Sequence, residues 1–435
     1  MNLTIDQQKI ANDIFKIMIE GKHDSIILSG PAGTGKTYLV HHILTEVLDK
    51  YKKTCKLLGI KPRFNHQYRD PFIITATTNK AVSVLKQSVL NIVDNVTTIE
   101  SALGLVVSGD TDKGKYTLKP NPRKGLTTYD DQIIIIDEAS MIDRELYMYI
   151  KKCCENCFII FIGDDCQLPA VRGGICPTVF NLGIPEFKLT TLVRQANNTD
   201  LIKISNIMRN TVYTKQFQKI KQNKSIYWYP DPKDQEAILK NITMRDPVKI
   251  LTYTNKKSIQ YNDYILKNLY GDQYLLVPHE TYITNNFVKL SRNQTIPAES
   301  EINIKQIYGT EEFPFEAATC KFIKFSALTS IGEKDLLTPE DPAYFLNWLK
   351  YIAKYRDWAS YFHYKENIVD LRGQYSCTIH KSQGSTFNTV IIDADDFKYC
   401  NNPEIAARLL YVAVSRAQEK IIFFGNLPQK YGEFI

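Results

Sequence analysis

The sequence predicts an α/β protein in which the buried strands of parallel sheets alternate with helices. Three short apolar runs indicate such strands, because each is rich in β-branched or aromatic residues and ends in polar residues: Ser25–Leu28, Ile133–Ile136 and Phe158–Ile162. A second α/β unit begins with the strand at Val248, and its partner strand lies far downstream at Val390–Asp393. The 435 residues allow two or three domains, each with its own core.

The composition is that of a soluble globular protein, with 44% hydrophobic and 23% charged residues. The net charge of +7 is compatible with nucleic-acid binding, although an AT-rich genome would give a similar excess of lysine. Because no apolar run reaches membrane-spanning length and the N-terminus lacks a signal-peptide pattern, we expect an intracellular protein. The nine cysteines are interpreted as reduced, buried thiols rather than as disulfides or a metal site.

The strongest local signal is a glycine-rich segment that has the phosphate-loop pattern of Gly, four residues, then Gly-Lys-Thr. A strand enters the loop and a helix over Tyr38–Asp49 leaves it, so backbone N–H groups can converge on phosphate oxygens. Lys36 can reach the β and γ phosphates, and the Thr37 hydroxyl can bind Mg²⁺. The segment predicts nucleotide binding by Gly30, Pro31, Ala32, Gly33, Thr34, Gly35, Lys36 and Thr37.

Polar residues at the ends of the next strands predict hydrolysis. Asp137 and Glu138 follow an isoleucine run in the Walker B pattern, so Asp137 would hold Mg²⁺ and Glu138 would orient or deprotonate the attacking water. Gln167 follows the Phe158–Ile162 strand and can bond the γ-phosphate or that water. Gln7 lies one helix before the loop, and its spacing leaves two roles open: reading the adenine edge, or an ordinary surface position.

Three further segments are interpreted from their patterns. Lys50–Asp70 is predicted to be polar and irregular, and Leu105–Leu118 to be a β-hairpin that either projects as a tool or is a surface excursion. The region from about Asn268 to Asp370 is predicted to be an insertion, strand-like first and helical from Asp341. Aromatic residues recur along that helix at i, i+3 and i+4, and we interpret this stripe, which includes Phe345, as packing core rather than as a base-stacking platform.

Taken in order, these motifs resemble the superfamily 1 helicases of the Pif/RecD-like group, and within it the Dda-like helicases of T-even bacteriophages. The resemblance covers essentially the whole chain, and the Thr-x-His-Lys-Ser-Gln-Gly form of one motif is especially discriminating. The matching segments are Leu3–Gln7, Gly30–Thr37, Ala76–Ala81, Asp137–Ser140, Gly163–Pro169, Leu192–Arg194, Thr378–Gly384 and Leu410–Ala417.

The resemblance implies two RecA-like P-loop NTPase domains, with parallel sheets flanked by helices, that enclose ATP and Mg²⁺ between them. The first would span residues 1–193, with an inserted hairpin subdomain at about 97–128. The second would combine residues 194–267 and 371–435, and residues 268–370 would form an inserted β-plus-helix subdomain.

The resemblance also implies roles for individual residues. Arg194 and Arg416 would be arginine fingers on the γ-phosphate, and Gln383 and Gly384 would contact the nucleotide. Some relatives carry a tyrosine that stacks on adenine where this chain has Val193. The Leu105–Leu118 hairpin would be the strand-separating pin, with Val107 or Tyr116 near its tip. The residues expected along single-stranded DNA are Thr78, Asn79, Thr98, Thr254, Asn255, Thr378 and His380.

The implied function is an ATP-dependent DNA helicase that moves 5′ to 3′ on single-stranded DNA in replication, recombination or repair. It would be a monomer without membrane contact, in the host cytoplasm if phage-encoded, and its candidate protein partners are replication or single-strand-binding proteins. One alternative is a nucleic-acid-dependent ATPase that displaces proteins from DNA or acts on RNA without processive unwinding. A P-loop kinase or ligase for small molecules is a third class, against which Thr378–Gly384 and Leu410–Ala417 argue.

Overall fold

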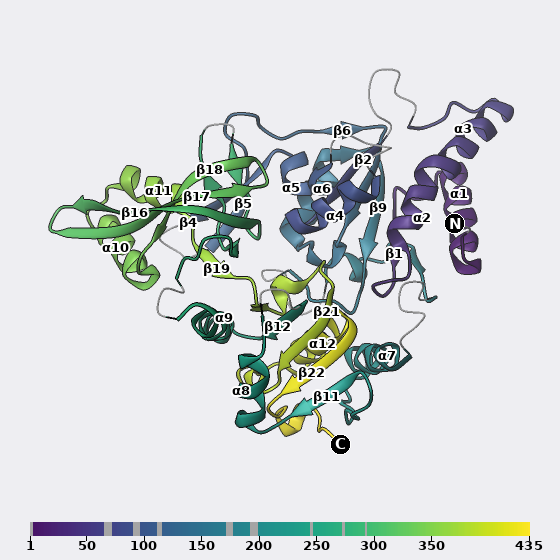
Figure 1. Ribbon diagram of the computed structural model, residues 1–435. Helices are drawn as coiled ribbons and strands as arrows, with labels where there is room; N and C mark the ends of the chain where they lie inside the picture. The colour runs from purple at the N-terminus through teal and green to yellow at the C-terminus, as the bar shows by residue number, and fades with distance from the viewer. Residues whose placement is uncertain are drawn as a thin grey trace.

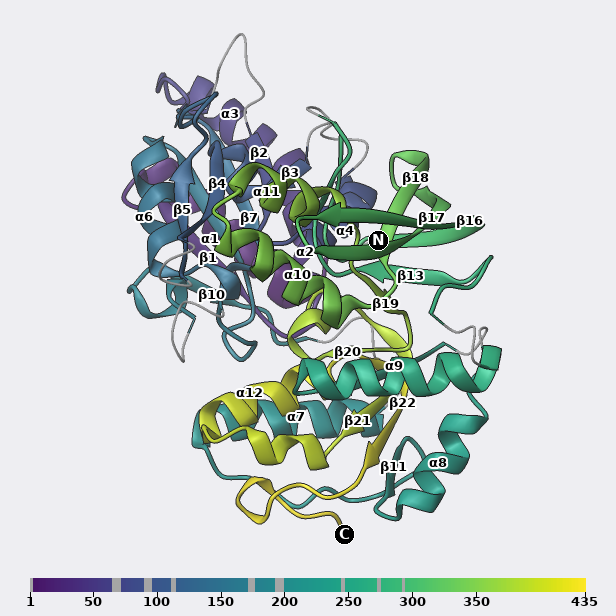
Figure 2. The same ribbon diagram turned by 90° about the vertical axis from the view of Figure 1, so that its left-hand side faces the viewer.

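Three β-sheets organise the chain in the computed structural model, which describes residues 3–64, 72–89, 96–110, 115–170, 177–191, 199–243, 247–271, 275–291 and 294–435. Figures 1 and 2 show an N-terminal sheet above a C-terminal sheet, with a third sheet beside them. Within these described ranges, no helix is long and apolar enough to cross a membrane.

The N-terminal sheet has the strand order β10-β1-β9-β7-β2-β3, and neighbouring strands pair in parallel. Successive residues point to opposite faces, so Ile26 and Leu28 join one core cluster while Ile27 joins another. Helices cover both faces, which explains why these strands are apolar throughout. The strands are β1 (Ser25–Ser29), β2 (Phe72–Ala76), β3 (Val96–Thr98), β7 (Ile133–Asp137), β9 (Phe158–Gly163) and β10 (Glu186–Lys188).

The helices of this domain divide between those two core clusters. The first cluster receives α1 (Ile5–Glu20), α2 (Lys36–His42), α3 (Leu48–Leu57) and α4 (Asn79–Val89). The second receives α5 (Ile99–Ala102) and α6 (Arg144–Cys153).

The prediction for Lys50–Asp70 was wrong at its start, because helical structure continues from α2 through a π-helical turn at Ile43–Val47 into α3. Tyr51 and Cys55 are buried one turn apart on α3. This i, i+4 spacing indicates a helix, but the polar composition of the segment made it easy to overlook. The predicted hairpin is confirmed: β4 (Leu105–Asp110) pairs antiparallel with β5 (Lys115–Pro120).

The C-terminal sheet has the order β11-β22-β21-β12-β20, again with parallel pairings. Its strands are β11 (Ile226–Tyr229), β12 (Val248–Thr252), β20 (Ser376–Thr378), β21 (Phe387–Asp393) and β22 (Ala417–Phe424). Helices α7 (Thr199–Thr214) and α12 (Pro403–Val414) lie side by side on one face. Helices α8 (Pro232–Lys240) and α9 (Asn255–Tyr270) pack on the other. The predicted pairing of the Val248 strand with the distant Val390 strand is confirmed.

The third sheet is antiparallel, with the order β18-β17-β16-β13-β19. Its strands are β13 (Thr281–Thr284), β16 (Glu301–Phe315), β17 (Ala318–Thr329), β18 (Gly332–Pro339) and β19 (Leu371–Gly373). Two helices follow β18: α10 (Pro342–Lys354), which packs on β17, and α11 (Trp358–Asn367). Phe345 and Trp348 are buried against Phe322, so the aromatic stripe of α10 is packing core as predicted. Short pairs link β6 (Tyr129–Asp130) to β8 (Cys154–Glu155) and β14 (Val288–Lys289) to β15 (Thr295–Ile296).

Candidate nucleotide site and nucleic-acid track

The glycine-rich loop joins β1 to α2 and holds its own lysine. The Lys36 ammonium donates hydrogen bonds to the carbonyl oxygens of Gly30 at 2.7 Å and Pro31 at 3.0 Å. The Thr34 hydroxyl also donates to the Pro31 oxygen, at 2.9 Å. Gly35 takes a left-handed conformation with φ 76° at the start of α2, where a side chain would be strained. These hydrogen bonds and the left-handed glycine define the shape of the loop.

Gln7 lies behind this loop rather than on the surface, with only 2% of its area exposed. Its side-chain oxygen accepts from the backbone N–H of Thr4 at 3.0 Å, completing a capping box at the start of α1. Its side-chain amide nitrogen donates to the Thr34 oxygen at 3.1 Å, and a Cβ at Gly35 would lie 2.5 Å from that nitrogen. The surface interpretation of Gln7 is wrong, because the structure shows an amide that supports the phosphate loop; its contact with adenine stays a prediction.

The two acids after β7 are crowded into the same pocket. Glu138 has a left-handed backbone with φ 54°, a conformation that non-glycine residues adopt mostly at functional sites and turns. Its N–H donates to the Asp137 carboxylate at 2.8 Å. Burial raises the pKa of Asp137, and burial together with the negative charge of Asp137 raises the pKa of Glu138 to about 7. Burial also lowers the pKa of Lys36, although nearby carboxylates oppose this shift.

The opposite wall of the pocket comes from the C-terminal domain. Arg416 follows α12, is 3% exposed, and donates to the backbone oxygens of Val412 at 3.0 Å and Ser385 at 3.1 Å. A Cβ at Gly384, whose φ is 74°, would lie 3.7 Å from a carboxylate oxygen of Glu138. The pocket of about 510 Å³ is lined by Ala32, Gly33, Gly35, Lys36, Thr37, Tyr38, His41, Val84, Asp137, Glu138, Gly163, Gln167, Gly384, Ser385, Thr386 and Arg416.

The pocket has the groups that a nucleotide and its cation require. Thr37 and Asp137 both line it and offer the hard oxygen ligands that Mg²⁺ prefers. The Ser385 hydroxyl is buried there without a hydrogen-bond partner in the described part of the chain, which leaves a polar group for a ligand to satisfy. Gln383 lies beside the pocket, and its amide nitrogen is 3.5 Å from the side-chain oxygen of Gln167.

Comparison with known proteins identifies the family. Residues 3–231 match the family model described as an AAA domain. The chain belongs to this family. Residues 374–424 match the UvrD-like helicase C-terminal domain. This range includes Gly384 and Arg416. The AAA domain therefore supplies the phosphate loop and both acids, and the helicase domain supplies the opposite wall.

Individual relatives extend over the whole chain. The chain is 23% identical to the uncharacterized protein R530 of Acanthamoeba polyphaga mimivirus, over 96% of this chain and 98% of that protein. It is 22% identical to the ATP-dependent DNA helicase dda of Enterobacteria phage T4, over 97% of this chain and 99% of that protein. Its fold resembles the Pif1 helicase from Bacteroides in complex with ADP-AlF3 and ssDNA, with a TM-score of 0.52, 17% identity, and coverage of 99% and 94%. The predicted membership of the Pif/Dda-like superfamily 1 helicases, with two RecA-like domains, is confirmed.

The threonines expected along DNA share one geometry. Thr98 and Thr378 end their strands, and Thr78 and Thr254 lie two residues beyond theirs. In each case the hydroxyl oxygen accepts from the backbone N–H three residues later, as a helix or turn cap. The distances are 3.2 Å for Thr78 to Ala81, 3.2 Å for Thr98 to Ser101, 3.3 Å for Thr254 to Lys257 and 3.4 Å for Thr378 to Lys381.

The strands that carry these threonines are neighbours: β2 pairs with β3 in one domain, and β12 pairs with β20 in the other. Asn79 and Asn255 occupy the same position in the two domains, as the first, exposed residue of α4 and α9. His380 lies in the turn after β20, where burial lowers its pKa.

Some predicted residues lie outside this description. Arg194 and Val193 fall outside the described residues, and so do the side chains of Val107 and Tyr116. The sequence reasoning missed two arginines, Arg209 on α7 and Arg408 on α12, which contact the Asp164–Gln167 turn after β9. The sequence signal that could have identified Arg209 is its place next to the apolar face of α7, where Met208 and Val212 are core residues.

Proposed function

We propose that the chain is an ATP-dependent DNA helicase that translocates on single-stranded DNA. The observation that carries this proposal is the construction of the pocket, whose phosphate loop and acids come from one RecA-like domain and whose Arg416 comes from the other. Binding and hydrolysis of a nucleotide there would change the fit between the domains. The likeness to a protein named as an ATP-dependent DNA helicase supports the proposal that this motion drives translocation on DNA.

The chemistry follows from the residues of the pocket. Thr37 and Asp137 would hold Mg²⁺, which when bound neutralises phosphate charge. Lys36 would exchange its two loop carbonyls for phosphate oxygens, and Arg416 would stabilise the charge that develops on the γ-phosphoryl group. Glu138, with its raised pKa, would accept the proton of the attacking water, while Gln167 would orient that water. Arg194 would be a second arginine finger.

The two neighbouring strand pairs would form the track. Thr78, Asn79 and Thr98 would contact the strand from the first domain, and Thr254, Asn255, Thr378 and His380 from the second. Neutral hydroxyl, amide and backbone groups suit phosphates and sugars, so binding would not depend on base sequence. We propose that alternate gripping by the two domains moves the DNA from 5′ to 3′ past the β4–β5 hairpin, which would act as the pin. The protein would work as an intracellular monomer, in the host cytoplasm if phage-encoded.

An unwinding assay tests the proposal. DNA duplexes with a 5′ or a 3′ single-stranded tail, and matching RNA duplexes, are incubated with the protein and MgATP. We expect separation of the 5′-tailed DNA duplex. Preference for the 3′ tail would overturn the direction alone. ATPase activity stimulated by DNA, with displacement of a bound protein but no unwinding, would replace the helicase by a remodelling ATPase.

A further inference from the structure

A buried ion-pair network joins the two RecA-like domains beside the nucleotide pocket. Asp164 is fully buried directly after β9 of the first domain, and Asp165 follows it. Arg209 on α7 of the second domain places one guanidinium nitrogen 3.0 Å from an Asp164 oxygen and the other 2.7 Å from an Asp165 oxygen. The planar guanidinium therefore binds both acids at once, a geometry that a lysine cannot reproduce.

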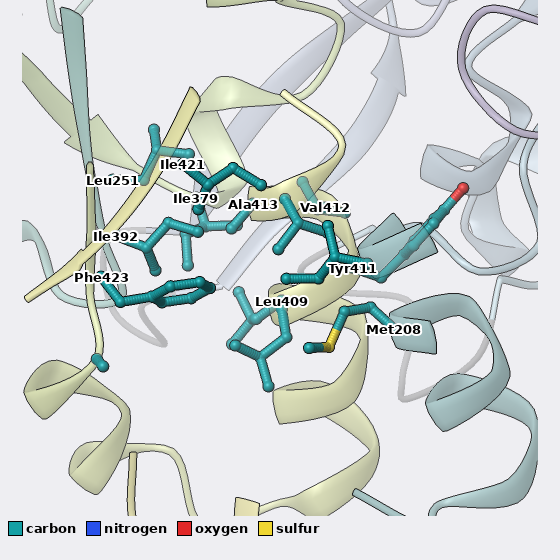
Figure 3. Close-up of a cluster of buried hydrophobic side chains, with 14 of the residues drawn as sticks. Met208, Leu251, Ile379, Ile392, Leu409, Tyr411, Val412, Ala413, Ile421 and Phe423 are labelled. Atoms are coloured by element: carbon teal, nitrogen blue, oxygen red, sulfur yellow. The ribbon is translucent and has the colours of Figure 1, made fainter. Parts of the chain in front are cut away.

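Tyr411 on α12 extends this network towards Arg416. Its hydroxyl donates to the second oxygen of Asp164 at 2.6 Å and accepts from Arg209 at 3.2 Å. Figure 3 shows the Tyr411 ring leaving the apolar cluster of Leu409, Val412 and their neighbours, with its oxygen pointing away from them. The same helix ends just before Arg416, so Tyr411 and the arginine that lines the pocket lie within two turns of each other at one end of α12.

The network also holds the turn that carries Gln167. The backbone N–H of Gln167 donates to the Asp164 carbonyl at 3.1 Å, and the N–H of Cys166 donates to the Asp164 carboxylate at 3.1 Å. Arg408 donates to the carbonyl oxygen of Gln167 at 2.9 Å. Asp164 therefore contacts the turn that carries Gln167 through its backbone carbonyl, and Tyr411, five residues before Arg416, through its carboxylate.

We propose that Arg209 and Tyr411 are positioning residues that hold Gln167 and Arg416 in the relation that hydrolysis requires. Burying charges costs desolvation energy, and apolar side chains would join the two domains at lower cost. Buried polar contacts do, however, restrict the surfaces to one orientation. The network would therefore keep the turn after β9 in one orientation relative to α7 and α12 when the pocket closes. This inference rests on the proposed ATPase function, and neither residue is placed in contact with substrate.

The test compares two phenylalanine variants that make the same chemical change. Tyr411→Phe removes the hydroxyl that binds Asp164. The control, Tyr431→Phe, removes a hydroxyl from another fully buried tyrosine of the same core cluster, which donates to the Cys400 oxygen at 2.6 Å. Arg209→Lys is the second test variant, because it keeps the positive charge but loses the planar guanidinium that binds both acids at once. ATPase kinetics are measured with single-stranded DNA, and binding of ADP is compared with binding of ADP plus aluminium fluoride without DNA, by calorimetry on the full chain.

We expect Tyr411→Phe and Arg209→Lys to lower kcat by about tenfold, since each loses a hydrogen bond to a charged group that matters in the transition state. The KM for ATP and the affinity for ADP should stay near the wild-type values, while the preference for ADP with aluminium fluoride is lost. Tyr431→Phe, which loses a hydrogen bond to a neutral carbonyl, should lower Tm but keep both kcat and the preference.

Two results would overturn the inference: a preserved preference in both test variants, or no preference in the wild type. Failure of the helicase proposal shows instead as absent unwinding by a wild-type protein that keeps the preference.

Discussion

The nucleotide pocket and the candidate DNA track are built from the same element, polar residues at the carboxyl ends of parallel strands, but they treat charge differently. In the pocket, Lys36, Glu138 and Arg416 are charged groups whose pKa values burial shifts. Along the track, Asn79 and Asn255 are neutral and exposed. The difference follows from the ligands, because a phosphoryl group in reaction needs desolvated charge at fixed positions, whereas a moving strand needs contacts that release.

The two domains repeat the track but not the pocket. Thr78-Asn79-Lys80 after β2 and Thr254-Asn255-Lys256 after β12 place the same three residue types at the start of a helix. Only the first domain has a phosphate loop among the described residues, and the second contributes Arg416 instead. The proposed helicase would need this arrangement, because it would have two alternating contacts with DNA and one ATP site.

Loss of the pocket lysine should have the largest effect, and it should distinguish ATP turnover in the pocket from DNA binding along the track. Lys36→Ala should abolish measurable ATP turnover, because no other cation of the loop lines the pocket among the described residues. Affinity for single-stranded DNA, measured by fluorescence anisotropy, should remain near wild type because Lys36 does not lie on the track. Lys9→Ala, on the exposed face of α1, is the control. Turnover that persists in Lys36→Ala would contradict the assigned site.

The arginine from the second domain should give the next largest effect. Arg416→Ala should lower the DNA-stimulated kcat by on the order of 10³-fold if the guanidinium stabilises transition-state charge. Stopped-flow or steady-state ATPase assays measure this, with circular dichroism to confirm folding. Arg144→Ala, at the exposed start of α6, should leave kcat unchanged. Near-normal turnover in Arg416→Ala would remove it from the catalytic set.

Substitutions along the candidate DNA track should lower DNA affinity and leave kcat unchanged, the reverse of substitutions in the pocket. Asn79→Ala and Asn255→Ala should each weaken binding of single-stranded DNA by about fivefold, the value of one hydrogen bond of about 1 kcal/mol. The kcat at saturating DNA should not change, and the double variant should show additive losses if both domains grip the strand. Asn12→Ala on α1 is the matched control. Unchanged DNA affinity in both variants would remove the asparagines from the track.

Gln7 should give the smallest effect and decide its role. Gln7→Ala removes the amide contact with Thr34 and should raise the KM for ATP by a few-fold, on the scale of a neutral hydrogen bond. Because that amide holds the loop, we expect the KM for GTP to change by the same factor. A loss confined to ATP would instead assign Gln7 to the adenine edge.

Much of the fold could be predicted because its signals are local. The isoleucine run of β7 alternates between two cores, and the loop pattern of Gly30–Thr37 lies between a strand and a helix, as the spacing predicted. The miss at α3 has a physical reason. Its lysines make the stretch polar on average, while Tyr51 and Cys55 bury one narrow face.

The sequence alone determined the phosphate loop and the acids at 137 and 138, since each is encoded within a few adjacent residues, and it determined the resemblance to a helicase as an ordered series of such short motifs. Only the tertiary structure decided which distant groups meet. Tyr411 and Asp164 are 247 residues apart, and Arg209 and Asp165 are 44 apart, yet each pair makes a hydrogen bond. Such pairs leave no periodic or motif signal, because the packing of the turn after β9 against α7 and α12 brings them together.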